Sequence, residues 1–313
     1  MGVSLGWAQA MRPYAGERWS PLLLLVALAT ATVAAAFALS ARRDVAAGFI
    51  RPRPGRANAS ALLTRPLGLA MRLQRGSLLA WAAGLFIGGL AGGGLAVEAD
   101  AFTDALGEEF FPASGASLTD QLLAFFLLFM ALLTAGAVLQ SALRARGEEI
   151  AGRADPVLAA AVPRWQWVAG HLVVALAGGV FILTLVGVGA GLVYGADTGD
   201  AGEVPRLAGA ALVHLPAIAL LLAVAVLLFG FVPRAVGAVW VLLGYAAFIA
   251  MFAPLFQLPD WMHDLSPFDH IPAVPADDLA PTPLLVLTAI AVALIAAGLG
   301  AGADGRGVHR LTT

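Results

Sequence analysis

The sequence predicts an all-α, polytopic membrane protein with about seven transmembrane helices, and three observations lead to that fold class. Hydrophobic residues make up 60% of the 313 residues and charged residues 12%, for a mean hydropathy of +0.87. Soluble domains are roughly half apolar and a quarter charged. Several apolar runs each approach the ~20 residues that a helix needs to cross the hydrocarbon. Arginines gather in alternate loops between these runs, as they do on the cytoplasmic side of membrane proteins.

The first predicted span could be confused with a secretory signal peptide, because Arg12 and Arg18 precede it and Ala36-Phe37-Ala38 resembles a cleavage site. The dense arginines that follow favour a true span, since cleavage would require that basic loop to cross the membrane. Six further spans follow. The predicted spans cover residues 21–40, 78–97, 121–140, 168–193, 207–230, 235–253 and 283–302.

The distribution of charge predicts an external N-terminus and a cytoplasmic C-terminus. Arginine is frequent in the first, third and fifth loops and in the C-terminal tail, whereas only Arg12, Arg18 and Arg206 fall on the opposite side. Acidic residues show the reverse bias, with clusters at 98–120 and 260–278. The chain is therefore expected to be a multi-pass protein of the plasma membrane.

Two residue types are absent, and their absence excludes several kinds of chemistry. The chain has no cysteine, which rules out disulfides, zinc–thiolate sites and thiol nucleophiles. All 18 basic residues are arginine, so the phosphate-binding lysine of a P-loop and Schiff-base lysines are also missing. We expect no catalytic site, no metal and no cofactor bound by this chain itself.

Proline and glycine divide the chain into three predicted parts. Residues 1–40 form an external segment and one span, and residues 41–61, with the run Arg51-Pro-Arg-Pro-Gly-Arg56, read as a cytoplasmic linker. Residues 62–313 form a six-span domain. Its first segment, 62–76, is expected either to be an amphipathic elbow helix at the interface or to be a basic flank of the next span.

The second span is rich in glycine. Gly84, Gly88 and Gly92 lie four residues apart on one face, with Gly89 and Gly93 beside them. Small residues at this spacing let helices approach closely in lipid, so the span is predicted to pack tightly against another helix. A gating role for the flexible glycines at 92–94 is the alternative.

The polar segment at 144–166 carries the signals of a cytoplasmic surface helix. Gly152 is suited to end one helix in the left-handed conformation, Asp155 to cap the next, and Pro156 to occupy its first position. Its charged residues form either a solvated loop with local ion pairs or a docking surface for another protein. The helix signals favour docking.

An external cap is predicted at 254–282. Two histidines and two aspartates within eight positions could bind zinc or act as acid and base, but the surrounding prolines and the lack of a His-Glu-x-x-His spacing favour a cap of short helices and turns. Within the spans, His214 is the one plausible ionisable residue, and His171 lies near a cytoplasmic end; a bonded structural histidine is preferred to a proton relay. The cap residues singled out are Trp261, His263, Asp264, Pro267, Asp269 and His270.

These features together resemble the permease domain of type-2 ABC exporters: an elbow, six spans, a cytoplasmic helix after the second of them, and an external structure before the last. Segment 148–164 is similar to the Glu-rich coupling segment of that class, which ends in Leu-Ala-x-x-Val-x-Arg, here Leu158 to Arg164. More narrowly, segments 41–48, 51–55, 66–76 and 264–268 resemble actinobacterial permeases described as polyketide-antibiotic exporters.

The resemblance implies the permease subunit of an ATP-driven exporter. ATP and Mg²⁺ would be bound by a separate nucleotide-binding ATPase, and the cargo would be a lipophilic or amphipathic compound such as a polyketide-type antibiotic, as in multidrug efflux and antibiotic resistance. Glu148, Glu149 and Arg153 would orient the ATPase, and Val157 and Leu158 would insert into it. The expected coupling residues are Arg144, Glu148, Glu149, Arg153, Asp155, Val157, Leu158 and Arg164.

The family also implies a twelve-span subunit, whose other spans would precede residue 21. A second permease half or another copy is therefore an expected partner, with membrane lipid and without nucleic acid. Two other functions remain open from the residues alone. One is a polytopic membrane hydrolase or metalloenzyme with an external His/Asp site, and the other is an ion-coupled carrier.

Overall fold

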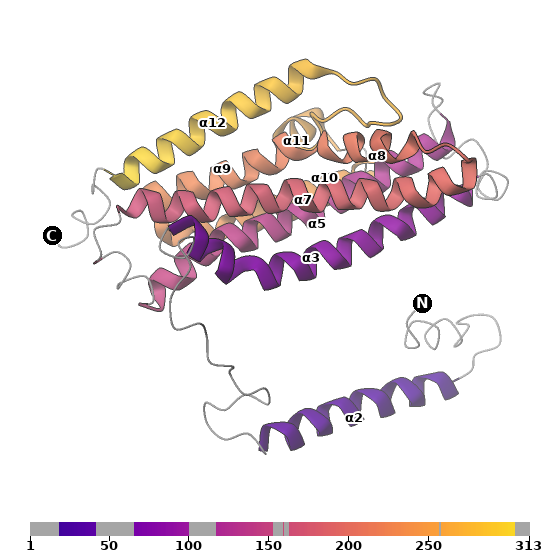
Figure 1. The fold of residues 1–313 in the computed structure, drawn as a ribbon, viewed down its shortest axis with the longest axis horizontal. Coiled ribbons are helices and arrows are strands. Elements are labelled where there is room, and N and C mark those ends of the chain that lie inside the picture. The colour runs from indigo at the N-terminus through magenta and orange to yellow at the C-terminus, as the bar shows by residue number, and fades with distance from the viewer. Residues whose placement is uncertain are drawn as a thin grey trace. The chain divides into compact units, whose positions relative to one another are not determined.

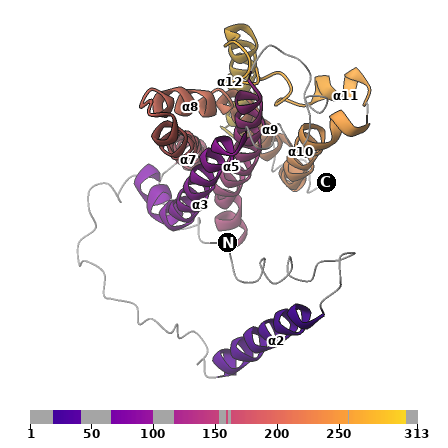
Figure 2. The same ribbon diagram turned by 90° about the vertical axis from the view of Figure 1, so that its right-hand side faces the viewer.

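The structure is a computed structural model that describes residues 19–41, 66–99, 117–152, 159, 163–256 and 258–303. Helices are the regular elements of these residues, with no strand among them (Figure 1 and Figure 2). The chain divides into two compact units, residues 1–58 and 59–313, and each is described by itself. The predicted all-α fold class is confirmed. The linker predicted at 41–61 lies almost wholly outside the described residues.

The described residues of the first unit form the helix α2 (Ser20–Ala41), which matches the predicted span at 21–40. The surface that it presents is apolar and exposed, with Leu23 70% and Phe37 74% accessible. Its two threonines are compatible with an apolar surface because their hydroxyls are hydrogen-bonded within the helix. The hydroxyl of Thr30 donates to the carbonyl of Val26, 2.9 Å away, and that of Thr32 donates to the carbonyl of Leu28. A helix that is apolar all round suits a lipid environment.

The second unit consists of long apolar helices joined by short connections. Helices α8 and α9 together form one span, as do η2 and α10, so this unit has six spans of sufficient length and hydropathy among the described residues. All six spans predicted for it are present. In chain order the elements are α3 (Pro66–Val97), α5 (Leu118–Ile150), α7 (Arg164–Thr198), α8 (Glu203–Leu212), α9 (Leu215–Phe231), the 3₁₀ helix η2 (Pro233–Ala238), α10 (Val239–Phe256), α11 (Asp260–Leu265) and α12 (Pro281–Ala303).

The start of α3 is continuous with the span that follows it. Either an elbow helix or a basic flank of the span was expected at 62–76; one helix runs from Pro66 to Val97, and its first turns bend away from the rest in Figure 1. A Cβ at Gly170 of α7 would lie 3.5 Å from the backbone of Leu67, in ordinary contact. The first turn of α3 is therefore packed against α7 within the bundle, while Arg72 and Arg75 stay exposed.

Helix α5 begins and ends with local signals that the sequence contains. The hydroxyl of Ser117 accepts a hydrogen bond from the backbone N–H of Asp120, 3.1 Å away, and so caps the first turn. At the other end Gly152 has a φ of +68°, which confirms the left-handed conformation predicted there. The helix continues ten residues beyond the predicted end of the span at Gln140, to Ile150.

Glycine brings three helices of the bundle close together. Helices α3 and α7 run parallel with their backbones in contact, since a Cβ at Gly89 would collide with the carbonyl of Val186, and one at Gly189 would lie 2.9 Å from the carbonyl of Phe86. Helix α5 runs antiparallel to both. A Cβ at Gly88 of α3 would lie 3.1 Å from the sulfur of Met130 on α5. This packing confirms the close approach that the glycines of the second span predict.

Two further helix pairs approach through glycine. A Cβ at Gly191 of α7 would lie 2.8 Å from the carbonyl of Glu203, where α8 folds back along α7. In the same way a Cβ at Gly298 of α12 would lie 2.7 Å from the carbonyl of Val226 on α9. Because lipid tails remove the hydrophobic drive for helices to associate, such close backbone contacts supply much of the attraction between them.

The two ends of the second unit carry opposite charge. One end holds exposed Arg72, Arg75 and Arg144, near the junction of α5 and α7. The other end holds Asp197, Asp200 and the acidic start of α8. That the arginine-rich end is cytoplasmic stays a prediction from this charge distribution.

Candidate functional site

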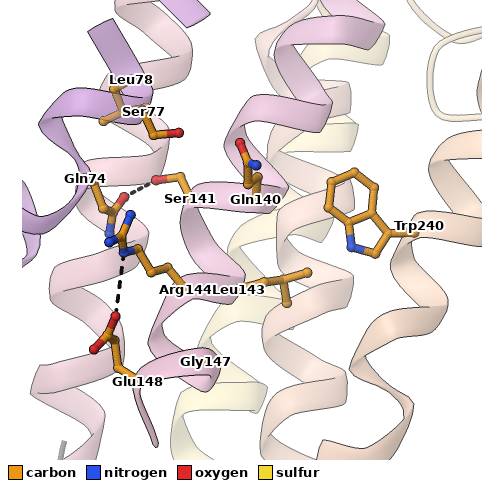
Figure 3. Close-up of a pocket in the computed structure, with 10 residues that line it drawn as sticks. All are labelled: Gln74, Ser77, Leu78, Gln140, Ser141, Leu143, Arg144, Gly147, Glu148 and Trp240. Carbon is orange, nitrogen blue, oxygen red and sulfur yellow. Dashed lines mark hydrogen bonds and ion pairs between the residues drawn. The ribbon is translucent and has the colours of Figure 1, made fainter. Parts of the chain in front are cut away.

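A cavity of about 410 Å³ lies among α3, α5 and α10 at the arginine-rich end of the second unit (Figure 3). Its volume lies within the several hundred Å³ that are typical of small-molecule sites. Amide, hydroxyl and charged side chains line it together with leucine and tryptophan. The lining residues are Gln74, Ser77 and Leu78 of α3, Gln140, Ser141, Leu143, Arg144, Gly147 and Glu148 of α5, and Trp240 of α10.

Two glutamine amides on neighbouring helices are held in the lining by hydrogen bonds. The indole N–H of Trp81 donates to the Oε1 of Gln140, 2.7 Å away, and the hydroxyl of Ser141 donates to the Oε1 of Gln74. Gln74 is 1% exposed, and its Nε2 has no hydrogen-bond partner among the described residues. Both amide oxygens are therefore used, which leaves the NH₂ groups of Gln74 and Gln140 for another acceptor.

A carboxylate and a guanidinium lie on the next turns of α5. Nε of Arg144 is 3.7 Å from Oε1 of Glu148, and the Glu148 side chain is 10% exposed. Glu148 was predicted to be a docking residue on the surface, but the structure buries it. The reason is that α5 remains helical as far as Ile150, so Glu148 falls on the same face as the buried Ser141 and Ala145.

Behind the cavity, α7 contributes two buried aromatic residues with polar atoms. Nδ1 of His171 donates to the carbonyl of Trp167, 3.0 Å away, and the two rings meet edge to face at 4.4 Å. Neither Nε2 of His171 nor Nε1 of Trp167 has a partner among the described residues. His171 is thus bonded to the backbone of its own helix near the arginine-rich end.

The predicted coupling residues fall on two helices and on the segment between them. Arg144, Glu148 and Glu149 occupy the last turns of α5 instead of a separate helix, and Arg164 is the first residue of α7. The remaining four, Arg153, Asp155, Val157 and Leu158, lie outside the described residues. The separate cytoplasmic helix from Pro156 is therefore still a prediction.

The predicted glycine face contributes unequally to packing. Gly88 and Gly92 contact side chains of α5, but a Cβ at Gly84 would meet nothing within 4 Å. The closest approaches come instead from Gly89 and Gly93, whose added Cβ atoms would strike the backbone of α7. Gly84 was therefore wrongly included, because the contact with α7 follows the neighbouring face of the helix.

The external cap consists of the short α11 followed by turns. Nδ1 of His263 lies 2.6 Å from Oδ2 of Asp269, and Nδ1 of His270 donates to the carbonyl of Ser266, 2.9 Å away. The hydroxyl of Tyr245 on α10 donates to the carbonyl of Met262, 2.7 Å away, which ties the cap to its span. Trp261 and Asp264 lie on α11, and Pro267 lies in the turn that follows. Among the described residues, no three His, Asp or Glu side chains are placed together so that they could hold a metal ion.

Sequence reasoning missed an ion-pair cluster at the acidic end. Arg206 of α8 contacts Asp120 of α5 through Nη2, and its Nη1 lies 2.7 Å from Oε2 of Glu203. This arginine is one of the three that depart from the charge pattern, which is the signal that could have identified it. Nearby, His214 is buried between α8 and α9, with Nδ1 3.4 Å from the carbonyl of Ala211.

Sequence reasoning also missed the polar residues of the cavity on α3. Gln74 lay in the segment expected to be an elbow helix or a basic flank, Gln140 lay at the end of a predicted span, and neither was singled out. A signal was available, since an amide beside an apolar run requires hydrogen-bond partners in the membrane. Which two amides face one cavity depends on how α3 and α5 pair, and this cannot be read from spacing within either helix.

Comparison with known proteins identifies the family. The model of the Multidrug efflux system permease Rv1217c, C-terminal domain, matches residues 63–301. The multidrug efflux system permease protein Rv1217c of Mycobacterium tuberculosis (strain ATCC 25618 / H37Rv) is 42% identical over 304 residues, which are 94% of this chain and 55% of that protein. The chain thus spans about half the length of this relative. Its six long apolar helices and this match together show a multi-pass protein of the plasma membrane that belongs to the family of multidrug efflux system permeases.

Proposed function

We propose that the chain is a permease subunit of a type-2 ABC exporter, which moves a lipophilic or amphipathic compound out of the cell. The observation that carries this proposal is the match with the multidrug efflux permease over 94% of the chain. The absence of lysine supports separate proteins for transport and for ATP hydrolysis, because this chain lacks the P-loop lysine that binds the phosphates of ATP. ATP and Mg²⁺ would be bound by that ATPase.

The ATPase would dock at the arginine-rich end, on the segment that joins α5 to α7. With the last turns of α5 and the first residue of α7, this segment spans residues 144–164, which carry four arginines, two glutamates and an aspartate. Helix α5 runs without interruption from Leu118 to Ile150, where this segment begins, so a displacement of its last turns would be transmitted along a rigid element. ATP would then bias a two-state arrangement of the spans through the partner that binds it.

The character of the spans suits a lipophilic cargo. Charged side chains of the described residues gather toward the two ends of the second unit, and the predicted spans contain no acidic residue deep within them. An ion would therefore find no fixed counter-charge on its way across. Polyketide-type antibiotics are the narrower cargo class that the resemblance of this chain implies.

The family resemblance implies one further partner. It would be a second permease half or another copy of this chain. The exposed aromatic side chains of α10, among them Phe248 and Phe252, are 42% and 43% accessible and would face either that half or lipid.

Co-purification with the ATPase encoded beside this gene tests the proposal. The native chain should retain the ATPase. Changing Glu149 and Arg153 to alanine should weaken binding at least tenfold, whereas Asp197→Ala, an exposed change at the acidic end, should leave it intact. Glu148 is tested separately because it is buried. Failure of the native chain to retain any ATPase would contradict the exporter function.

A further inference from the structure

We propose that the cavity lined by Gln74, Gln140 and Trp240 binds a flat, uncharged molecule that carries several acceptor oxygens along one edge. The inference rests on the proposed export function, since it specifies the chemistry of the cargo. It is drawn from the hydrogen-bonding state of the lining and from its charge.

The amide of Gln140 has a fixed orientation. The indole N–H of Trp81 is a donor only, so the atom 2.7 Å from it must be the amide oxygen, and the NH₂ group must point elsewhere. Gln140 is exposed although it lies well inside the apolar helix α5, and it lines the cavity. An NH₂ group in this position needs an acceptor that lipid tails do not provide.

The amide of Gln74 supplies a second, more buried pair of donors. Its oxygen accepts from the hydroxyl of Ser141, while its Nε2 has no partner among the described residues although the side chain is 1% exposed. A buried donor without a partner is costly, and a ligand oxygen would satisfy it. In Figure 3 the side chains of Gln74 and Gln140 lie on either side of Ser141, so that one ligand edge could reach both.

The charges of the lining disfavour an ionic ligand. Arg144 and Glu148 are 3.7 Å apart and together carry no net charge. A cation would meet the guanidinium and the amide N–H groups, and an anion would meet the carboxylate. Neutral carbonyl, ether or hydroxyl oxygens avoid repulsion by either charge and can accept hydrogen bonds from the amide NH₂ groups.

The opposite side of the cavity is apolar and aromatic. Figure 3 shows Trp240 of α10 across the cavity from Gln74, with Leu143 between the helices. An indole face favours a flat ring by stacking, and α10 does not approach the α5 backbone closely at Gly136, where an added Cβ would lie 3.8 Å from Leu243. The cavity thus combines a donor-rich edge with an aromatic wall.

The test uses three flat tricyclic probes that differ in oxygen and charge. Binding of 1,8-dihydroxyanthraquinone, 9,10-dimethylanthracene and 9-aminoacridine to the purified full chain in lipid nanodiscs is measured by quenching of tryptophan fluorescence, with empty nanodiscs correcting for partition into lipid. The uncharged anthraquinone, which has two carbonyls and two hydroxyls, should bind at least tenfold more tightly than the other two. Equal binding of all three would overturn the proposal.

Two variants and one control locate the binding. Gln140→Leu should weaken anthraquinone binding about five- to tenfold, since one hydrogen bond is lost. Gly147→Phe fills the cavity and should abolish binding; its Cβ meets nothing within 4 Å, so the fold is spared. Gly209→Phe on α8, equally unobstructed, should leave binding unchanged. Unaltered binding to Gly147→Phe would overturn the proposal.

This measurement involves no ATPase, so its failure is distinct from failure of the export function. If the chain binds the anthraquinone selectively but retains no ATPase, the proposed ligand chemistry is supported and the export function is contradicted. If the chain retains the ATPase but binds the three probes equally, the export function is supported and the proposed ligand chemistry is contradicted.

Discussion

The interface between α3 and α7 and that between α5 and α10 illustrate two ways of joining helices in a membrane. In the first, Gly89, Gly93 and Gly189 bring two backbones into contact. In the second, a Cβ added at Gly136 would lie 4.0 Å from Trp240 and 3.8 Å from Leu243, and a cavity of about 410 Å³ remains beside this contact. Small residues on both helices exclude a cavity, whereas one small residue facing bulky side chains leaves room for a ligand.

The degree of burial follows the same division. The apolar windows of α5 and α7 are 61% and 56% buried, compared with 22% for α10 and 17% for α12. Helices α5 and α7 therefore form the buried centre of the unit, to which α3, with 28% of its window buried, is held along its glycine face, and the surface of α10 is open to lipid or to another chain. Substitutions should consequently be severe in the first region and mild in the second.

The largest effect is expected from Gly89→Leu. The added Cβ would collide with the backbone of Val186, which cannot rotate away as a side chain would, so we expect a loss of about 3 kcal/mol or more and little folded protein. The measurement is the yield of monodisperse protein and its midpoint of unfolding in mixed micelles. Gly84→Leu, five residues before Gly89 on the same helix but in open space, should behave like the native chain. Equal yields and unfolding midpoints of the two variants would contradict the role of the backbone contact between α3 and α7 in stabilising the bundle.

A smaller effect is expected from Glu148→Ala beside the cavity. Its carboxylate is buried next to Arg144, and its removal should destabilise the chain by about 2 kcal/mol. Glu149→Ala, on the adjoining and more exposed position, should cost less than about 0.5 kcal/mol. Unfolding in mixed micelles measures both. A larger loss for Glu149→Ala would mean that the burial of the two carboxylates is the reverse of that described.

The ion-pair cluster at the acidic end should contribute about 1 kcal/mol, because Arg206 is partly exposed there. A double-mutant cycle with Arg206→Met and Asp120→Asn measures the coupling between α8 and α5. A coupling below about 0.3 kcal/mol would show that α8 is held by Gly187 and Gly191 alone.

The smallest effect is expected from His263→Ala in the external cap. Its contact with Asp269 is partly exposed, so the loss of stability should remain below about 1 kcal/mol. Elemental analysis of the purified chain provides the second readout. Stoichiometric zinc in the native chain that disappears in this variant would favour the metalloenzyme alternative over transport.

The sequence alone determined the class and the framework. Apolar runs of membrane-spanning length predicted the spans, since the bilayer dictates both their length and their composition. Gly152 was predicted to be left-handed from its position between two helices, and the structure shows it so. These features are local, and local sequence is sufficient to specify them.

Only the tertiary structure decided which residues meet. Glu148 was assigned to the surface but is buried, and Gly84 was assigned to packing but faces open space, because helix rotation depends on neighbours outside the segment. The cavity also depends on such neighbours. Gln74, Gln140 and Trp240 come from three helices, and their distances follow from how closely glycine lets each pair of helices approach.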